Sequence, residues 1–306
     1  MKNVLVIGSY NVGLVVVGPR IPSAGQTIMG HEFQMGPGGK GSNQAIAVKR
    51  LGGEVAFVAR VGGDSFGRDA LDMFRREGLD ARFVAVDEKH HTGAGIIFVD
   101  SQGQNAIGVA PGANYQLSAD DLEAAASLFA PGAILLIQLE TPLDIVRQAV
   151  HRARQAGMTV ILNPAPAPTQ PLEEDILSCV DVITPNETEA HELTGIEVKD
   201  SASAQQAARK LQAAGAKSVV ITLGSAGALL LDSNGPKVFA PYRVKVVDTT
   251  GAGDAFNGGL AYALSAGKSM EEAIDFANRV GALCVTKAGT IDGLPSLAEV
   301  MLLKRS

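Results

Sequence analysis

The feature that most limits the fold of this chain is a repeated alternation of short apolar runs with alanine-rich helical windows. The runs are rich in Val, Ile and Leu without polar alternation, which is typical of strands buried on both faces. They lie at 4–8, 55–61, 133–139, 159–164, 180–186 and 218–224. The helical windows lie at 41–51, 66–77, 118–127, 141–156, 186–194 and 201–214. The sequence therefore predicts an α/β fold whose parallel sheet is covered by helices on both sides.

Two segments interrupt this alternation. Residues 13–35 contain two prolines and several glycines among β-type residues and show no helix signal. Residues 92–109 alternate apolar and polar positions, with a turn expected at 100–103. We predict that both segments form a small separate sheet, a lid over the edge where ligands bind. The alternative is a pair of ordinary surface hairpins.

Composition excludes several classes of partner. The chain has 306 residues, 46% of them hydrophobic, and a net charge of −6 without a basic block, which argues against nucleic acid and anionic membranes as partners. Apolar runs such as 133–137 are too short to span a bilayer. Residues 1–10 resemble a strand and not a signal peptide, and Cys179 and Cys284 stand alone in apolar contexts. We therefore expect a cytoplasmic protein with buried, reduced thiols.

A glycine-rich stretch, GPGGKGSNQA, occupies residues 36–45. It matches the spacing of a dinucleotide fingerprint, but that fingerprint belongs directly after the first strand. It also resembles a P-loop, but Gly41 follows Lys40 where Ser or Thr would hold magnesium. Small residues at a helix start let backbone N–H groups approach a polar ligand, and Lys40 and Asn43 suit ligand hydroxyls. Glycines needed only for close packing remain the alternative.

A second glycine-rich stretch, VVDTTGAGDAFNGG, occupies residues 246–259. Gly251, Ala252 and Gly253 can turn their N–H groups toward one point at the start of a helix predicted over 254–264, where they would stabilise anionic oxygens. An aspartate beside such oxygens suits a base that takes a proton from an attacking hydroxyl. Asp254 is therefore either a catalytic base or an N-cap of the helix.

Two further motifs are weaker when each is taken alone. Asn186 and Glu189 lie three residues apart at a helix start and suit a hydrated magnesium ion, or they form a capping box in which Thr184 or Asn186 is the cap. The segment 222–230 combines a strand end, a glycine-rich turn and a second strand. It could shelter a nucleotide or be an ordinary hairpin.

Together and in this order, five motifs resemble the ribokinase-like (PfkB) family of sugar and nucleoside kinases over essentially the whole chain. The motifs are GPGGKGSNQA, LNPAPAP (162–168), ITPNETEA (183–190), TLGSAG (222–227) and DTTGAGDAFNGG (248–259). The resemblance implies a single Rossmann-like three-layer α/β/α domain over 1–306, with a central mostly parallel sheet. It also implies a small β-sheet lid formed by about 12–37 and 91–111, through which a homodimer forms.

The resemblance also implies roles for individual residues. Asp254 is the catalytic base, and Gly251, Ala252 and Gly253 form the anion hole. The sugar-contacting positions are Asn11, Gly13, Gly38, Gly39, Lys40, Asn43 and Glu140. The ATP-side positions are Asn186, Thr222, Gly224, Ser225, Gly227, Gly253 and Asn278. Magnesium is organised by Asn186 and Glu189, largely through water, and a monovalent cation, K⁺, by Asp248, Thr250, Cys284, Lys287, Gly289 and Gly293.

Two positions depart from the family pattern. Gly13 stands where the pattern has an aspartate that accepts hydrogen bonds from sugar hydroxyls, and Gly293 stands where a serine is usual. The first departure puts selection for ribose in doubt, and the second puts K⁺ activation in doubt. The family still implies an ATP-dependent kinase that phosphorylates a sugar hydroxymethyl group, with ribose as the first candidate. Alternatives are a kinase for deoxyribose, a ketose, a modified sugar or a nucleoside, and a non-catalytic sensor. An NAD-linked oxidoreductase would rest on the fingerprint spacing alone.

Overall fold

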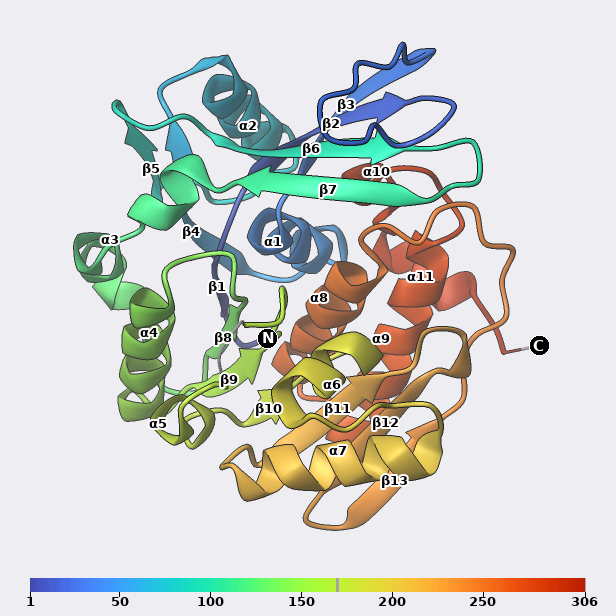
Figure 1. Cartoon of the computed structure of the whole chain (residues 1–306). Coiled ribbons are helices and arrows are strands. Elements are labelled where there is room, and N and C mark those ends of the chain that lie inside the picture. The colour runs from blue at the N-terminus through green and yellow to red at the C-terminus, as the bar shows by residue number, and fades with distance from the viewer. Residues whose placement is uncertain (169–170, 306) are drawn as a thin grey trace.

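A nine-stranded sheet forms the centre of the molecule in the computed structural model, which describes residues 1–168 and 171–305 (Figure 1). Its strand order is β13-β12-β11-β10-β9-β8-β1-β4-β5. The strands are β1 (Val4–Ile7), β4 (Val55–Gly62), β5 (Val84–Asp87), β8 (Ile134–Ile137), β9 (Thr159–Leu162), β10 (Val182–Ile183), β11 (Ser218–Thr222), β12 (Ala228–Asp232) and β13 (Gly235–Phe239). All pairs from β11 to β5 are parallel, and β12 and β13 add an antiparallel edge. The predicted mostly parallel sheet is confirmed.

Helices cover both faces of this sheet. Side chains alternate along β1, so that Val4 and Val6 pack into one apolar cluster and Leu5 and Ile7 into the other. The first cluster includes α1 (Lys40–Arg50), α2 (Ser65–Arg76), α8 (Ala252–Ser265), α9 (Met270–Cys284) and α11 (Leu297–Leu302). The second includes α3 (Ala119–Ala124), α4 (Leu143–Gln155), α5 (Glu174–Leu177), α6 (Glu187–Thr194) and α7 (Ser201–Ala213). The expected three layers are therefore present.

The boundaries of two predicted elements were wrong. The strand expected over 180–186 is only Val182–Ile183, because Asn186 is already the N-cap of α6. The helix expected over 118–127 ends at Ala124 and continues as a short 3-10 turn, Ala126–Leu128. In both places a cap or turn interrupts a run that is otherwise periodic.

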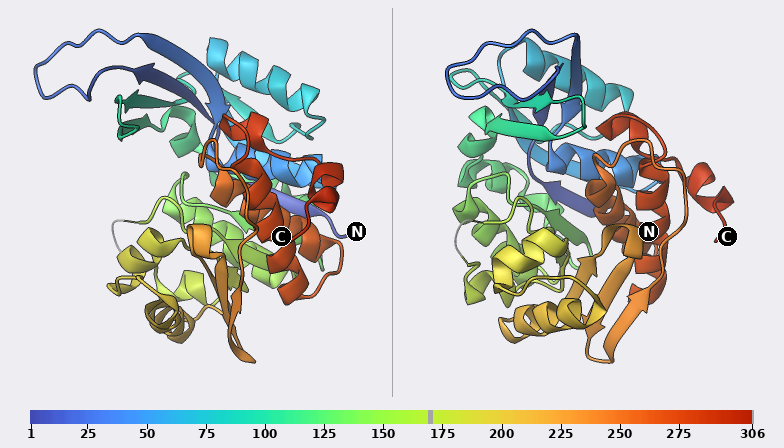
Figure 2. Two further views of the ribbon diagram at one scale, coloured as in Figure 1. Left: turned by 90° about the vertical axis from the view of Figure 1, so that its right-hand side faces the viewer. Right: turned by 45° about the vertical axis from the view of Figure 1, so that its right-hand side comes forward.

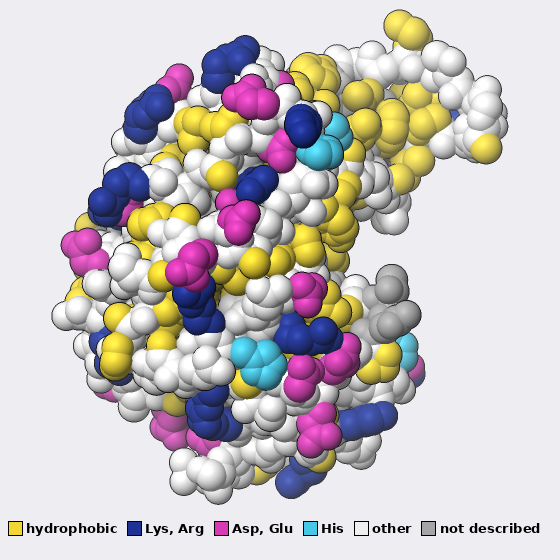
Figure 3. Space-filling model, turned by 90° about the vertical axis from the view of Figure 1, so that its left-hand side faces the viewer, with side chains coloured by type: hydrophobic (Ala, Val, Ile, Leu, Met, Phe, Trp, Pro, Cys, Tyr) yellow, Lys and Arg dark blue, Asp and Glu magenta, His cyan; other side chains and the backbone are white. Residues whose placement is uncertain are grey.

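A separate four-stranded sheet projects from one end of the molecule (Figure 2). Its order is β3-β2-β6-β7, with strands β2 (Asn11–Val17), β3 (Glu32–Gly38), β6 (Gly93–Val99) and β7 (Asn105–Ala110). Since β2 pairs in parallel with β6, the two interrupting segments form one sheet and not two independent hairpins. The turn at 100–103 is present, and the Asp100 carboxylate accepts hydrogen bonds from the backbone N–H groups of Gln102 and Gln104. In Figure 3 this sheet forms an arm beside a deep hollow in the surface.

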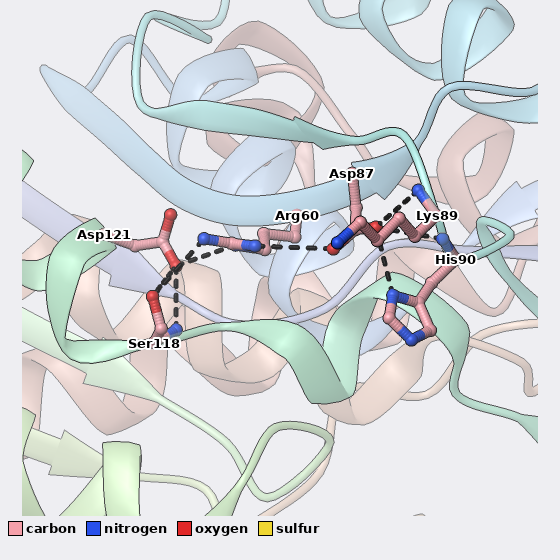
Figure 4. A network of polar contacts seen from close by, with 6 residues as sticks. All are labelled: Arg60, Asp87, Lys89, His90, Ser118 and Asp121. Carbon is pink, nitrogen blue, oxygen red and sulfur yellow. Dashed lines mark hydrogen bonds and ion pairs between the residues drawn. The ribbon is translucent and has the colours of Figure 1, made fainter.

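A network of polar contacts lies where the chain leaves the large sheet for β6 (Figure 4). Arg60 on β4 donates to Asp121 at 2.8 Å and to Asp87 at 3.4 Å. Asp87 also accepts hydrogen bonds from the backbone N–H groups of Lys89 and His90 and lies 3.0 Å from the His90 ring. The Lys89 N–H, followed by the His90 contacts, outweighs desolvation and lowers the pKa of Asp87 to about 2. The network thus joins the segment before β6 to the body of the protein.

Among residues 1–168 and 171–305, no helix is long and apolar enough to cross a bilayer. Cys179 and Cys284 are both buried free thiols, as expected.

Candidate functional site

The candidate site lies at the carboxyl ends of the central parallel strands, the edge at which α/β sheets bind ligands. Ser9 and Asn11 follow β1, Gln138 and Glu140 follow β8, and Asn163 follows β9. The strand order reverses at β1, because the chain adds β4 and β5 on one side of β1 and then β8, β9 and the later strands on its other side. The ends of β1 and β8 therefore form a topological switch point. The fold thus brings together residues that are more than a hundred positions apart.

The start of α1 lies directly against the end of β1. Gly39, its N-cap, has φ +92°, and a Cβ there would come within 2.7 Å of Asn11 N and Tyr10 Cα. Glu140 fixes this arrangement, because its Oε2 accepts hydrogen bonds from Lys40 N at 2.9 Å, Asn11 Nδ2 at 3.5 Å and the Ser9 hydroxyl. Close packing, which was the alternative explanation for the glycines, therefore does apply at Gly39. The same close packing of α1 against β1 places Lys40 and Asn43 beside the site.

Asp254 lies in the first turn of α8 and is not its N-cap. The N-cap is Gly251 with φ +79°, so the helix begins at Ala252, two residues earlier than predicted. The Asp254 carboxylate is 7% exposed and accepts hydrogen bonds from Asn43 Nδ2 at 2.7 Å and Gln44 Nε2 at 2.9 Å. The N-cap interpretation of Asp254 is wrong, since this carboxylate faces α1 and not the amides of its own helix.

Charges of both signs meet around Lys40. Burial by itself lowers the pKa of Lys40, but the carboxylates of Asp254, Glu140 and Glu189 outweigh it and raise that pKa above its usual value. Desolvation raises the pKa of Glu189, against the Asn186 N–H and Lys40, which lower it. The site therefore holds a charged ammonium group among three carboxylates, an arrangement suited to anionic oxygens and a cation together.

Asn186 and Glu189 form a reciprocal capping box at the start of α6. Asn186 Oδ1 accepts from Glu189 N at 2.8 Å, and Glu189 Oε2 accepts from Asn186 N at 2.9 Å. The capping interpretation is therefore correct for Asn186 and wrong for Thr184, which bonds elsewhere. These contacts use one side-chain oxygen of each residue, so Glu189 Oε1 can still face a ligand or a bound water.

One cavity of about 720 Å³ adjoins α6, the β11–β12 turn and the start of α8. All seven residues expected on the ATP side line it: Asn186, Thr222, Gly224, Ser225, Gly227, Gly253 and Asn278. The segment 222–230 is a hairpin, with the turn Gly224–Ala226 between antiparallel strands, and it also lines the cavity. The volume of the cavity is in the range of small-molecule sites.

The two segments assigned to the monovalent cation also lie together. Asp248 accepts hydrogen bonds from Thr250 N at 2.9 Å and Gly289 N at 3.0 Å. Desolvation raises the pKa of Asp248, but these backbone donors outweigh it and hold the pKa below its usual value. Cys284 Sγ lies 3.9 Å from Thr250 O, whereas the Lys287 ammonium pairs with Glu299 at 2.6 Å.

Several residues at the site escaped the sequence analysis. Gln44 and Gln138 contact each other beside Asp254, although Gln44 lies within the quoted glycine-rich motif. Apolar side chains also line the cavity: Val246 and Phe256 lie within the quoted stretch 246–259 but were given no role, and Tyr242 lies on a loop outside every motif. The two adjacent valines at 246–247 precede the glycine-rich turn in the sequence, but only the structure shows that both are exposed.

The arrangement combines a buried carboxylate, a glycine-rich helix start and a cavity able to hold a nucleotide. Phosphoryl transfer needs this set: a base for the attacking hydroxyl, backbone donors for the phosphoryl oxygens and a site that positions the donor. Gly253 lines the cavity and Asp254 is the next residue, so the Asp254 carboxylate lies beside the cavity.

Comparison with known proteins gave consistent similarities. A family profile described as "pfkB family carbohydrate kinase" matches residues 1–297. The chain is 40% identical to a ribokinase of Haemophilus influenzae over 300 residues, which cover 98% of this chain and 97% of the relative. It superposes on a crystal structure of Thermotoga maritima ribokinase with TM-score 0.90, 34% identity and 99% coverage of both chains. Arabidopsis thaliana ribokinase, solved with ribose and ATP, gives TM-score 0.90, 33% identity and coverage of 99% and 98%.

Proposed function

Because the chain belongs to the pfkB family of carbohydrate kinases, we propose that it transfers the γ-phosphoryl group of ATP to the hydroxymethyl group of a pentose, converting ribose to ribose 5-phosphate. One observation carries the assignment of the site. The buried Asp254 carboxylate borders the nucleotide-sized cavity through Gly253 and contacts Asn43 on the side of Glu140 and Asn11. A base in that position separates a donor side from an acceptor side.

The proposed reaction uses these residues in one displacement. Asp254 takes the proton of the sugar hydroxyl as its oxygen bonds to the γ-phosphorus, and the bond from phosphorus to the β,γ-bridging oxygen breaks to release ADP. The N–H groups at Gly251–Gly253 donate to the phosphoryl oxygens at the start of α8, and Lys40 adds positive charge. On the acceptor side, Asn11, Gly38, Gly39, Asn43 and Glu140 surround the sugar.

The residues present fit a magnesium ion that is held mainly by phosphate and water. No cluster of three or more His, Cys, Asp or Glu suited to a metal occurs in the described part of the chain. Glu189 is a nearby buried carboxylate. Burial raises its pKa, so a cation beside it would stabilise its charged form. Mg²⁺ commonly takes one or two carboxylates and substrate phosphates, so Asn186 and Glu189 would hold it largely through water. When bound, it neutralises developing phosphate charge.

The loops at 248–250 and 284–293 fit a potassium site, and they explain the Gly293 departure. A Cβ at Gly293 would come within 3.1 Å of Cys284 O and 3.2 Å of Cys284 Sγ, so the thiol occupies the space that a serine side chain would need. We propose that backbone carbonyls of Thr250, Cys284 and Gly289 surround K⁺, with Asp248, Lys287 and Gly293 shaping the loops. When bound, the cation would supply a positive charge close to the turn Gly251–Gly253.

A second substrate class is favoured by a row of glycines on the small sheet. Gly13 is in register with Gly36 on β3 and with Gly95 on β6, on the face that also carries Asn11. A Cβ at Gly36 or Gly95 meets no atom within 4 Å, and one at Gly13 meets only Gly36 O at 3.5 Å and Ile97 Cδ1 at 3.9 Å. The row of Gly13, Gly36 and Gly95 carries no side chains, so this part of the small sheet leaves room for a sugar with an additional substituent.

A panel of acceptors separates these two candidates. We expect ATP-dependent ADP release with ribose, deoxyribose, a ketose, modified pentoses and nucleosides to differ by acceptor, and we expect Gly13→Asp to raise kcat/KM for ribose about tenfold. The reason is that a carboxylate at this position accepts hydrogen bonds from sugar hydroxyls. Gly95→Ala, which fills the same open row without a polar group, is the control and leaves ribose activity unchanged. An unaltered ribose kcat/KM in Gly13→Asp would show that Gly13 is not the specificity determinant.

We further propose a cytoplasmic homodimer that forms through the small sheet, which closes as a lid over the site. Phe33, Met35 and Ile96 are 64%, 55% and 50% exposed. They lie on one face of that sheet, because Leu14 is in register with both Met35 and Ile96, and Phe33 is two residues from Met35 on the same strand. Apolar side chains grouped in this way usually mark an interface. Pairing of two copies would cover them and the outer strands of the sheet.

Phe33→Asp combined with Met35→Asp is expected to produce monomers, because two charges would then be buried at the interface. Light scattering coupled to size-exclusion chromatography measures the mass directly. Val238→Asp replaces a similarly exposed apolar side chain on β13 and is expected to leave the dimer intact. A monomeric wild-type protein, or a dimeric double variant, would contradict this assembly.

A further inference from the structure

We propose that Gln44 is a positioning residue for Asp254, held in a single orientation by Gln138. The proposal deepens the proposed kinase function and rests on Asp254 being its base. Neither glutamine belongs to the set of residues that would touch sugar or ATP. Their part is to hold the reacting carboxylate in the direction that the incoming hydroxyl requires.

The two oxygens of Asp254 have different partners. Oδ2 accepts from Asn43 Nδ2 at 2.7 Å, whereas Oδ1 accepts from Gln44 Nε2 at 2.9 Å. Asn43 Oδ1 is buried and has no hydrogen-bond partner within residues 1–168 and 171–305, so Asn43 keeps an acceptor for a ligand hydroxyl. The two neighbours on α1 thus have separate tasks, since Asn43 can face the ligand while Gln44 faces only protein.

Every polar atom of the Gln44 amide is engaged. Nε2 donates to Asp254 Oδ1 and also to Asn163 Oδ1 at 3.0 Å, and Oε1 accepts from Gln138 Nε2 at 2.7 Å. Rotating the amide by half a turn would place its oxygen against the Asp254 carboxylate and its NH₂ against the NH₂ of Gln138. Gln44 is 0% exposed, so water cannot replace these partners. One orientation is therefore strongly preferred.

Gln138 holds the far end of this chain of hydrogen bonds. It follows β8, is 0% exposed, and lies over the bare backbone of Gly8 at the end of β1. A Cβ at Gly8 would come within 2.1 Å of Gln138 Oε1 and within 2.8 Å of the backbone atom Gly41 Cα, so a larger residue at position 8 would displace the Gln138 amide. The chain Gln138–Gln44–Asp254 thus joins the end of β8, through α1, to α8.

Orientation of a buried base has a kinetic consequence that differs from loss of packing. A change in the position of a reacting group lowers kcat, because a small displacement reduces stabilisation of the transition state more than it reduces binding of the substrate. Gln44→Met keeps the length and volume of the side chain but removes its amide. We expect kcat to fall about 10- to 100-fold, because the Asp254 carboxylate loses one of its two side-chain donors and a hydrogen bond to a charged group has about this value. KM for ATP and for the sugar stays within about threefold of the wild-type value.

Two further variants separate positioning from general destabilisation. Gln138→Met leaves Gln44 in place but removes the donor to its Oε1. We therefore expect a smaller kcat loss of about 3- to 10-fold and no added loss in the Gln44→Met background. Thr141→Val is the matched control, because it removes a buried hydroxyl without a partner in the described part of the chain and is expected to leave kcat unchanged. Thermal melting of each variant, with and without ATP, reports folding.

The decisive measurement is a double-variant cycle with Asp254→Asn. If Gln44 acts through Asp254, then Gln44→Met lowers kcat in the wild-type background and has no effect on the residual kcat of Asp254→Asn. Equal losses in both backgrounds, or a Gln44→Met kcat within twofold of wild type, overturn the proposal. If Gln44→Met does not fold, Gln138→Met alone decides, and an unchanged kcat in that variant also overturns it. A protein that phosphorylates no sugar, or keeps its rate in Asp254→Asn, instead contradicts the kinase function or the role of its base.

Discussion

Asp254→Asn is expected to lower kcat at least about 10³-fold, while binding of ATP and of the sugar changes little. The amide cannot accept the proton of the attacking hydroxyl, and general-base catalysis of this kind contributes about 10²- to 10⁴-fold. A 10³-fold loss corresponds to about 4 kcal/mol of transition-state stabilisation. Single-turnover kinetics, together with calorimetric binding of ATP and sugar, measures the two effects separately.

The structure indicates that this variant keeps its fold. An amide at position 254 can keep its oxygen toward Gln44 Nε2, and its NH₂ can donate to Asn43 Oδ1 once the Asn43 amide has flipped, since that oxygen has no other partner among the described residues. Glu192→Gln, which removes one exposed carboxylate from α6, is the control for charge and is expected to retain the wild-type rate. A wild-type rate in Asp254→Asn would remove Asp254 from the role of base.

Gly41→Ala is expected to lower the free energy of unfolding by about 3 kcal/mol, the upper part of the usual range for overpacking, and to reduce activity with it. A Cβ at Gly41 would lie 2.5 Å from Ser9 N and 2.6 Å from Gly8 C, which are both backbone atoms. Backbone atoms at the end of β1 cannot move aside as a flexible side chain can. The helix α1 would therefore shift, and it carries Asn43 and Gln44, the two donors to Asp254.

Denaturant unfolding and thermal melting measure this loss. Gly36→Ala is the matched control, since it lies in the same glycine-rich motif but meets no atom within 4 Å and is expected to change stability by less than about 0.5 kcal/mol. Equal stability of Gly41→Ala and Gly36→Ala would show that contact between α1 and β1 does not require glycine. A stable Gly41→Ala with reduced kcat would instead indicate displacement without unfolding.

Much of the fold could be predicted from local pattern. Residues 4–8 and 133–139 are nearly continuous apolar runs, which is the pattern expected of a strand that is buried on both faces of a sheet. The hairpin around Asp100 could be predicted because its turn chemistry is local. Boundaries were harder to predict, as the short β10 shows, because the cap at Asn186 and the strand before it compete for the same few residues.

The site could be predicted only as separate pieces. Asp254 and Asn186 each fitted a capping role and a functional role equally well from spacing, and the structure decided differently for the two. Asn186 is an N-cap, whereas Asp254 turns its carboxylate to α1. Local spacing fixes which residues share a helix turn but contains no information about which distant helix supplies the partner.

By itself, the sequence determined the alternation of strands and helices, the two β-type segments that interrupt it and the glycine-rich positions at which a ligand could approach the backbone. These follow from periodicity and from the conformations that glycine permits. Only the tertiary structure decided that Gln44 and Gln138 lie behind Asp254, and that Gly13, Gly36 and Gly95 form one open row. The physical reason is that the direction of a buried amide and the register of paired strands depend on contacts between distant segments. Neither leaves a periodic pattern in the chain.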